Sequence, residues 1–181
     1  MKKINCLFSV ILLIFCFSIP SYSETKNITF GVGAGLGIPL GDWSDVYNVG
    51  FGLKGNVFYS IRPQIDIVGN VELYHFTGGE EYSLLGVVEY EWDYSLTRLC
   101  FAGDGRYTFT GKVKFFGQAG LGLYYDMSKV ESDLFGSESD TETNIGFRFG
   151  GGVAFGNIEI IGIFHLVEDS NMLTINALYR F

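Results

Sequence analysis

Residues 28–41 read ITFGVGAGLGIPLG, and the alternation in this stretch indicates the architecture. Every second residue from Ile28 to Leu40 is apolar, and the positions between them hold mostly glycine. A helix would scatter these apolar residues around its circumference, whereas a strand places them all on one face. The other face is nearly bare. That weakens a strand in a water-soluble sheet, but it leaves room for larger side chains inside a narrow barrel.

The same period of two recurs in seven further segments, so the chain holds eight. The other seven are residues 50–59, 65–76, 99–109, 113–125, 145–155, 158–166 and 173–181. A tilted strand needs about 9–11 residues to cross a bilayer, and these segments have that length. The sequence therefore predicts an all-β chain, an eight-stranded antiparallel transmembrane up-and-down β-barrel.

The connections between the segments alternate in length. Three are short, at 61–64, 110–112 and 156–157, and four are longer, at about 41–49, 77–93, 126–143 and 167–171. Short turns at one end and long loops at the other are typical of outer-membrane barrels.

Two segments leave the inward face ambiguous. In 158–166 both faces are apolar, and we place Glu159, Ile161, Ile163 and His165 inside. In 92–98 the alternation is unclear, and Arg98 marks either a β-bulge or the membrane edge.

Residues 1–23 have the features of a cleaved secretory signal. A basic start precedes an apolar run over 7–19, and small residues precede a cleavage site ahead of Glu24. A lipoprotein signal ending at Cys16 is the alternative, but Phe15 is too large for that processing. The predicted barrel domain, 24–181, then keeps only Cys100, so it forms no internal disulfide.

Composition excludes several classes of protein. With 48% hydrophobic and 18% charged residues, the chain has enough apolar surface to fold, which excludes disorder. The net charge of -8 argues against a nucleic-acid partner. A soluble β-sandwich or lipocalin-like barrel is the alternative to a membrane barrel. The second face of the strands, however, carries too few charges to coat a soluble surface.

Three stretches carry a resemblance to a known group. They are GVGAGLGIPLGD at 31–42, AGDGRY at 102–107 followed by GQAGLGLY at 117–124, and LTINALYRF at 173–181. With them the mature chain resembles the small eight-stranded outer-membrane β-barrels of Gram-negative bacteria. These include the OmpA transmembrane domain, the OmpX/Ail-like proteins and the outer-membrane β-barrel domain family.

The resemblance implies a location in the cell outer membrane with periplasmic termini. It also implies contacts with outer-membrane lipid, with lipopolysaccharide and with the barrel-assembly machinery. The alternating C-terminal residues resemble the barrel-insertion signal that this machinery reads: Ile175, Ala177, Tyr179 and Phe181.

The inward face is predicted to carry five cations and four anions, which nearly cancel. The cations are Lys54, Arg106, Lys114, Arg148 and Arg180, and the anions are Asp66, Glu72, Asp104 and Glu159. Isolated charges are costly in a narrow interior, so we expect them to pair. They form either a salt-bridged plug or the lining of a small pore or gate. The narrow interior of an eight-stranded barrel favours the plug.

The two longest connections are predicted to be acidic outer loops. They carry Glu80, Glu81, Glu89, Glu91 and Asp93 in 77–93, and Asp126, Glu131, Asp133, Glu138, Asp140 and Glu142 in 126–143. This surface is either simply solvated and repulsive, or it binds divalent cations or a cationic partner. No EF-hand spacing supports a tight calcium site.

No motif for catalysis, cofactor binding or a metal stands out. His165 and Ser170 are five residues apart, and the glycine repeat lacks the G-x-G-x-x-G spacing. We therefore predict a non-enzymatic barrel that supports envelope integrity or surface interaction through acidic loops. A narrow passive channel for small solutes and a lipid-modifying outer-membrane enzyme are the alternatives. The sequence leaves the oligomeric state open, with a monomer favoured.

Overall fold

A computed structural model of the chain describes residues 28–84, 88–132 and 136–181. The predicted signal segment lies outside these residues. The elements are β1 (Ile28–Pro39), the 3₁₀ helix η1 (Gly41–Asp45), β2 (Gly50–Arg62), β3 (Ile65–Leu84), β4 (Val88–Thr108), β5 (Lys114–Ser132), β6 (Gly136–Phe155), β7 (Ile158–Leu166) and β8 (Met172–Arg180). Among the described residues, no helix is long and apolar enough to cross a membrane.

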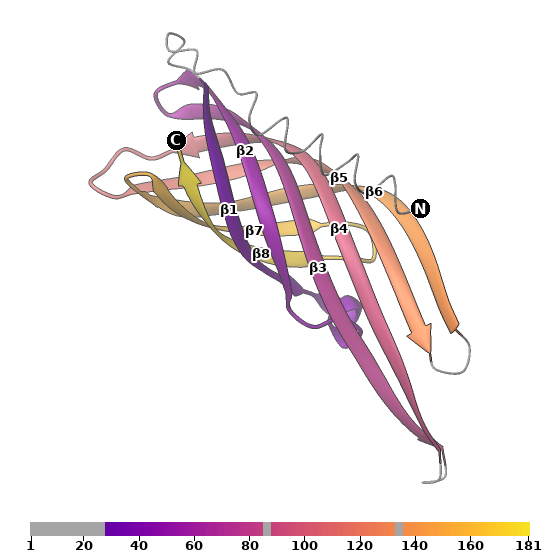
Figure 1. Ribbon diagram of the computed structural model, residues 1–181. Coiled ribbons are helices and arrows are strands. Elements are labelled where there is room, and N and C mark those ends of the chain that lie inside the picture. The colour runs from indigo at the N-terminus through magenta and orange to yellow at the C-terminus, as the bar shows by residue number, and fades with distance from the viewer. Residues whose placement is uncertain (1–27, 85–87, 133–135) are drawn as a thin grey trace.

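The eight strands form one closed antiparallel barrel in chain order (Figure 1). Each strand pairs with its neighbours in the sequence, and β1 closes the sheet by pairing with β8 from Gly31↔Arg180 to Pro39↔Met172. Phe30 and Phe181 extend this seam by exchanging two backbone hydrogen bonds of 3.1 and 2.9 Å. The predicted fold class is confirmed.

The period of two separates an apolar outside from a filled inside. Outward residues such as Leu121 (61% exposed) and Ile145 (75%) have no protein partner that covers them. Inward residues such as Glu72 and Arg148 are fully buried. In β7 the four residues placed inside are all buried, as predicted. A sheet with an apolar outside and a polar inside fits a lipid solvent.

The glycine face of β1 brings the seam strands close together. A Cβ atom at Gly33 would lie 2.3 Å from the Ala177 carbonyl oxygen, and one at Gly35 would lie 2.3 Å from Asn176 Oδ1. Any larger residue would therefore clash with β8. The bare face in the sequence is what allows the barrel to close tightly.

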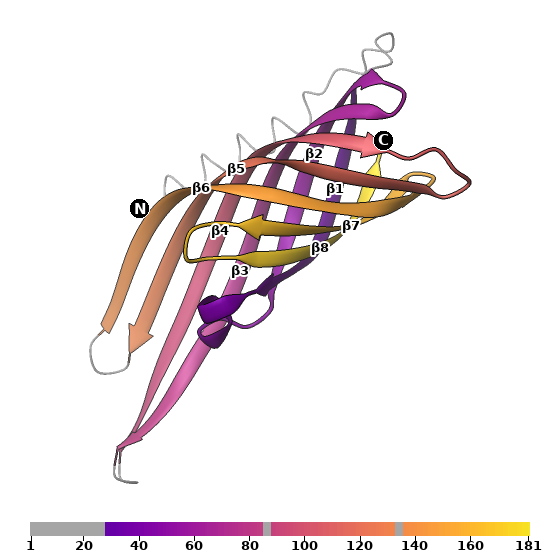
Figure 2. The same cartoon turned by 180° about the vertical axis from the view of Figure 1, so that it is seen from behind.

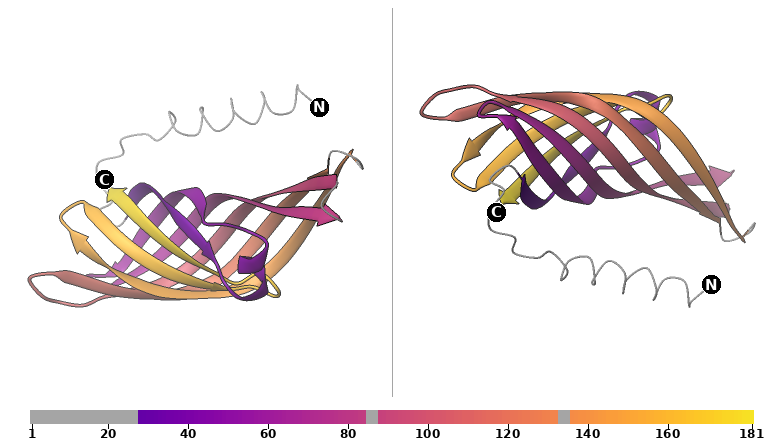
Figure 3. Two further views of the ribbon diagram at one scale, coloured as in Figure 1. Left: turned by 90° about the horizontal axis from the view of Figure 1, so that it is seen from below. Right: turned by 90° about the horizontal axis from the view of Figure 1, so that it is seen from above.

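The predicted loops at 77–93 and 126–143 are largely strand. The β3–β4 ladder continues to Leu84↔Val88, and the β5–β6 ladder continues to Ser132↔Gly136. Both hairpins project from the same end of the barrel, far beyond the ends of β7 and β8 (Figures 1 and 2). Two further views show the same projection (Figure 3). The loop prediction was wrong because the backbone pairing of β3 with β4 and of β5 with β6 continues through these polar stretches.

The opposite end has the short turns that the sequence predicts. β2 and β3 are joined through residues 63–64, β4 and β5 through 109–113, and β6 and β7 through 156–157. Gly156 has a φ of 61°, which suits the tight turn there. The barrel therefore has a short-turn end and a long-hairpin end.

We predict that Gly120→Ala destabilises the barrel by about 1–3 kcal/mol through overpacking. A Cβ atom at Gly120 would lie 2.0 Å from the Gly103 carbonyl oxygen and 2.4 Å from Asp104 Oδ1. Urea unfolding in detergent micelles, followed by heat-modifiable migration on gels, measures the change. Gly103→Ala is the matched control, because a Cβ atom there meets nothing within 4 Å. An equal loss of stability in Gly120→Ala and Gly103→Ala would contradict the tight packing described at Gly120.

Candidate functional site

A buried charge network occupies the middle of the lumen. Glu72 on β3 accepts hydrogen bonds from Lys54 Nζ on β2 at 2.6 Å and from Arg148 Nη2 on β6 at 2.8 Å. Arg148 Nε also lies 3.2 Å from Asp104 Oδ1 on β4. The side chains of all four residues are fully buried. The structure thus joins four of the predicted lumen charges across the barrel.

A second charge cluster lies nearer the short turns. Arg106 donates two hydrogen bonds, of 2.7 and 2.9 Å, to the carboxylate of Glu159. Arg180 Nη1 lies 3.6 Å from both Glu159 Oε1 and Asp66 Oδ2. The Arg106 guanidinium also packs 3.5 Å from the centre of the Phe116 ring, a favourable cation–π contact. Four more of the predicted charges are therefore paired with one another.

Lys114 does not belong to the lumen, and its prediction as a lumen charge was wrong. It is the first residue of β5 and is exposed at the short-turn end. Its place in the alternation is inward, but the strand has only begun at this position. The period of two predicts on which face of the sheet a side chain lies, but it does not predict how far along the barrel axis that side chain lies.

Two apolar clusters lie on either side of the charge network. Toward the long hairpins are Tyr74, Phe76, Leu96, Cys100, Tyr124, Val167 and Met172. Toward the short turns are Phe116, Ile161, Ile163 and Leu178. All of these side chains are buried, so the described lumen is packed with side chains through its length.

His165 is held inside this packing by two polar contacts. Its Nδ1 lies 2.9 Å from the Tyr124 hydroxyl and its Nε2 lies 3.0 Å from Thr174 Oγ1. Ser170 Oγ bonds instead with Arg98 and with the Glu168 carbonyl. The structure therefore does not bring His165 and Ser170 together as a catalytic pair.

A buried group of contacts around Arg98 was not predicted from the sequence. Its Nε donates to Asp126 Oδ1 at 2.7 Å, and its Nη1 donates to the Ser170 carbonyl at 2.9 Å. Its guanidinium lies 4.4 Å from the centre of the Trp43 ring. Fully buried, Arg98 therefore ties β4 to β5, to η1 and to the β7–β8 connection. We call Arg98, Asp126, Ser170 and Trp43 the mouth latch.

The sequence left two interpretations of Arg98 open, a β-bulge or the membrane edge, and no bulge is present in the described pairing at this residue. Arg98 pairs with Tyr74 on one side and Asp126 on the other, and the ladder runs without interruption. Arg98 shares its inward position with Cys100, and Asp126 shares its own with Tyr124. Continuing the alternation beyond the predicted strand ends would have found both residues.

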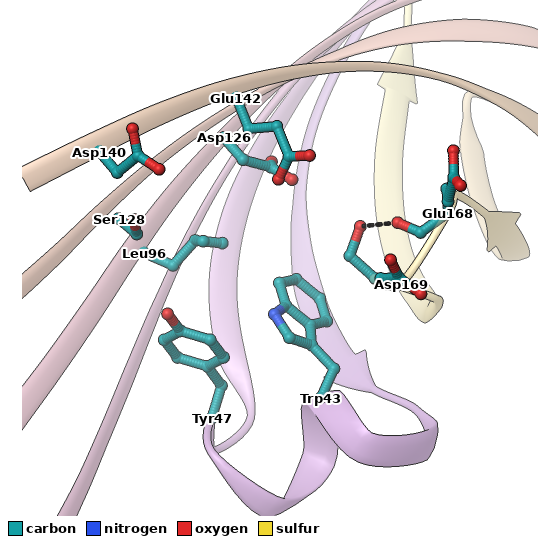
Figure 4. A pocket seen from close by; sticks show the side chains of 10 residues that line it. Trp43, Tyr47, Leu96, Asp126, Ser128, Asp140, Glu142, Glu168 and Asp169 are labelled. Atoms are coloured by element: carbon teal, nitrogen blue, oxygen red, sulfur yellow. Dashed lines mark hydrogen bonds between the residues drawn. The ribbon is translucent and has the colours of Figure 1, made fainter.

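An acidic cavity of about 200 Å³ opens beside the mouth latch (Figure 4). Its lining includes two aromatic side chains of the β1–β2 connection, Trp43 and Tyr47, and five carboxylates: Asp126, Asp140, Glu142, Glu168 and Asp169. Burial, with a contribution from the Asp126 carboxylate, raises the pKa of Tyr47. Within residues 28–84, 88–132 and 136–181, no group of three or more His, Cys, Asp or Glu side chains is placed to hold a metal ion.

The profile of a protein family, "Outer membrane protein beta-barrel domain", matches residues 9–157. The chain belongs to this family. Like the other members, this outer-membrane barrel resides in the outer membrane of Gram-negative-type bacteria.

Solved structures show the same fold. The barrel is similar to Ail, the attachment invasion locus protein of Yersinia pestis, solved with the heparin analogue sucrose octasulfate. The TM-score is 0.55 at 18% identity, covering 86% of this chain and 98% of Ail. It is also similar to a major outer membrane protein from Thermus thermophilus. There the TM-score is 0.50 at 14% identity, covering 85% and 99% of the two chains. No curated protein sequence matches the barrel significantly.

We predict that Arg98→Ala destabilises the barrel by about 3–5 kcal/mol, because it leaves the Asp126 carboxylate buried without its cation. The β1–β2 and β7–β8 connections should also become accessible to protease, since the latch holds both. Urea unfolding and limited cleavage after Glu168 measure the two effects.

Two controls accompany this variant. Arg62→Ala removes an exposed arginine at the opposite end and should change neither measurement. The double variant Arg98→Ala with Asp126→Ala should recover part of the lost stability, because the unpaired carboxylate is gone. If Arg98→Ala alone were as stable as the wild type, the contacts of the mouth latch would not stabilise the barrel.

Proposed function

We propose that this protein is a non-enzymatic surface protein that binds cationic partners at its long-hairpin end. The observation that carries the proposal is the acidic cavity with its two aromatic walls, which lies above a lumen packed with side chains. Carboxylates attract a cation at long range, and aromatic faces favour it at contact.

The charge pattern of the extended hairpins supports this proposal. On β6, Glu138, Asp140 and Glu142 alternate with serine and threonine, so the acidic side chains share one face. Asp140 and Glu142 on that face line the cavity, and Glu168 and Asp169 face them from the β7–β8 connection. The side chains of 79–92 and 131–136 lie outside the described set, and several of the predicted acidic residues fall there.

The membrane orientation is part of the proposal. We place the termini and short turns in the periplasm and the long hairpins outside the cell. The apolar wall contacts outer-membrane lipid and lipopolysaccharide. The exposed residues Ile175, Tyr179 and Phe181, with Ala177 between them, form the signal for the assembly machinery. The lumen charges, Lys114 excepted, serve to hold the plug together.

The contacts of the lumen side chains argue against the two alternatives, a channel and an enzyme. A channel needs a continuous path, whereas the Glu72 network and the two apolar clusters fill the described lumen. An enzyme that uses His165 needs a free ring nitrogen and access from outside, and both nitrogens of this buried ring have partners. The Ail ligand, sucrose octasulfate, is a polyanion that an acidic hairpin end would repel.

Binding of a fluorescent oligoarginine peptide to the folded barrel in micelles tests the proposal. Neutralising four cavity residues, by Asp140→Asn, Glu142→Gln, Glu168→Gln and Asp169→Asn, should weaken binding by about tenfold, or 1.4 kcal/mol. The matched control removes the same charge from exposed carboxylates outside the cavity lining: Asp42→Asn, Asp45→Asn, Asp93→Asn and Glu138→Gln. Equal weakening in both variants would mean that net charge, and not the cavity, attracts the peptide. Stepwise conductance of the wild type in a planar bilayer would favour the channel instead.

We predict that deleting Phe181 impairs assembly in cells while the purified chain still refolds into micelles. The deletion removes one aromatic ring and the two backbone hydrogen bonds between Phe181 and Phe30. Losing the burial of the ring costs about 1.5–3 kcal/mol, and a folded barrel can tolerate that loss. Outer-membrane fractionation and a gel-shift refolding assay measure the two outcomes. Wild-type assembly in cells would remove Phe181 from the insertion signal.

A further inference from the structure

The short-turn end carries exposed basic side chains and no exposed acidic side chain among the described residues. Arg62 lies beside the β2–β3 turn, Lys112 lies in the β4–β5 turn, and Lys114 follows it; all three are exposed. The two carboxylates nearest this end, Asp66 and Glu159, are buried and paired with arginines inside the barrel. We call Arg62, Lys112 and Lys114 the basic rim.

The basic rim is one surface, because the two turns are joined. The Thr108 backbone N–H donates to the Gln64 carbonyl at 2.8 Å, which connects the end of β4 to the β2–β3 turn. The Phe109 N–H donates to the Phe115 carbonyl at 2.8 Å and closes the β4–β5 turn. In the described part of the chain, none of the three rim cations forms an ion pair. Their charge is therefore available to a partner.

An aromatic belt places the basic rim at a defined depth. Around the short-turn end the outer wall exposes Tyr59, Tyr107, Phe109, Phe115, Phe155, Tyr179 and Phe181, each between 44% and 56% exposed. Such rings settle at the boundary between hydrocarbon and headgroups. Lys114 is adjacent to Phe115, Lys112 is three residues past Phe109, and Arg62 is three residues past Tyr59. The cations therefore lie just outside the belt, at the level of the lipid phosphates.

We propose that the basic rim binds the headgroups of anionic phospholipids and so gives the barrel a preferred lipid neighbourhood. Cations held near an anionic membrane surface are attracted to it, and the long stems of lysine and arginine let their charged ends reach the phosphates. The described acidic side chains that are exposed belong to the opposite end of the barrel, so none of them neutralises the basic rim. The inference is independent of what the acidic cavity binds.

Spin-labelled lipids test this in phosphatidylcholine vesicles that contain the folded protein. Electron paramagnetic resonance gives the fraction of label immobilised at the barrel surface, for labelled phosphatidylglycerol and for labelled phosphatidylcholine. For the wild type we expect a preference for phosphatidylglycerol of at least about twofold at low salt. It should approach one in about 0.5 M NaCl, where the Debye length is only a few ångström. Sodium phosphate at equal ionic strength should act no more strongly than NaCl.

The decisive comparison uses two variants with the same net charge change. Neutralising the rim, by Arg62→Gln, Lys112→Gln and Lys114→Gln, should abolish the preference. Removing the same charge at the long-hairpin end, by Lys129→Gln, Ser137→Asp and Ser139→Asp, should leave it intact. Heat-modifiable migration shows that each variant is folded. A rim variant that keeps the preference, or a hairpin variant that loses it equally, would overturn the proposal. A stronger effect of phosphate than of NaCl would overturn it in favour of a discrete anion site.

Discussion

Closure of β1 onto β8 is the constraint on which the rest of this structure depends. In a lipid solvent every backbone N–H and C=O must find its partner within the protein, and an open sheet edge fails this requirement. The seam from Gly31↔Arg180 to Pro39↔Met172 removes the edge. Because Gly33 and Gly35 face β8 with no side chain, the two strands can approach without a clash.

Because the closed barrel is narrow, inward-facing side chains must fill its interior. Many of these side chains are polar. Burying Glu72 alone would be costly, but Lys54 and Arg148 both bind its carboxylate. The same logic joins Arg106 to Glu159 near the short turns. Each pair links different strands, so these contacts help to fix the register of the wall as well as fill it.

The sequence predicted the faces of the strands well and their ends poorly. Alternation depends on the pleat, a local property, so it correctly assigned even the ambiguous β7 residues Ile161 and Ile163. Where a strand ends depends on how far its partner continues to pair with it, which a single segment does not encode. For that reason the alternation predicts an inward Lys114 and a loop over 126–143, whereas Lys114 is exposed and most of 126–143 is strand. The mouth latch was missed because Arg98 and Asp126 lie in those misread strand ends.

The mouth latch also bears on the order in which the molecule is assembled. It joins side chains at positions 43, 98, 126 and 170, so its ring of contacts reaches across most of the barrel sequence. Contacts of such high sequence separation form late, since the intervening chain must first be ordered. The guanidinium of Arg98 acquires all its partners only when the final hairpin, β7–β8, is in place. In a barrel interrupted before that hairpin, the buried Arg98 guanidinium would lack its two hydrogen bonds to Ser170.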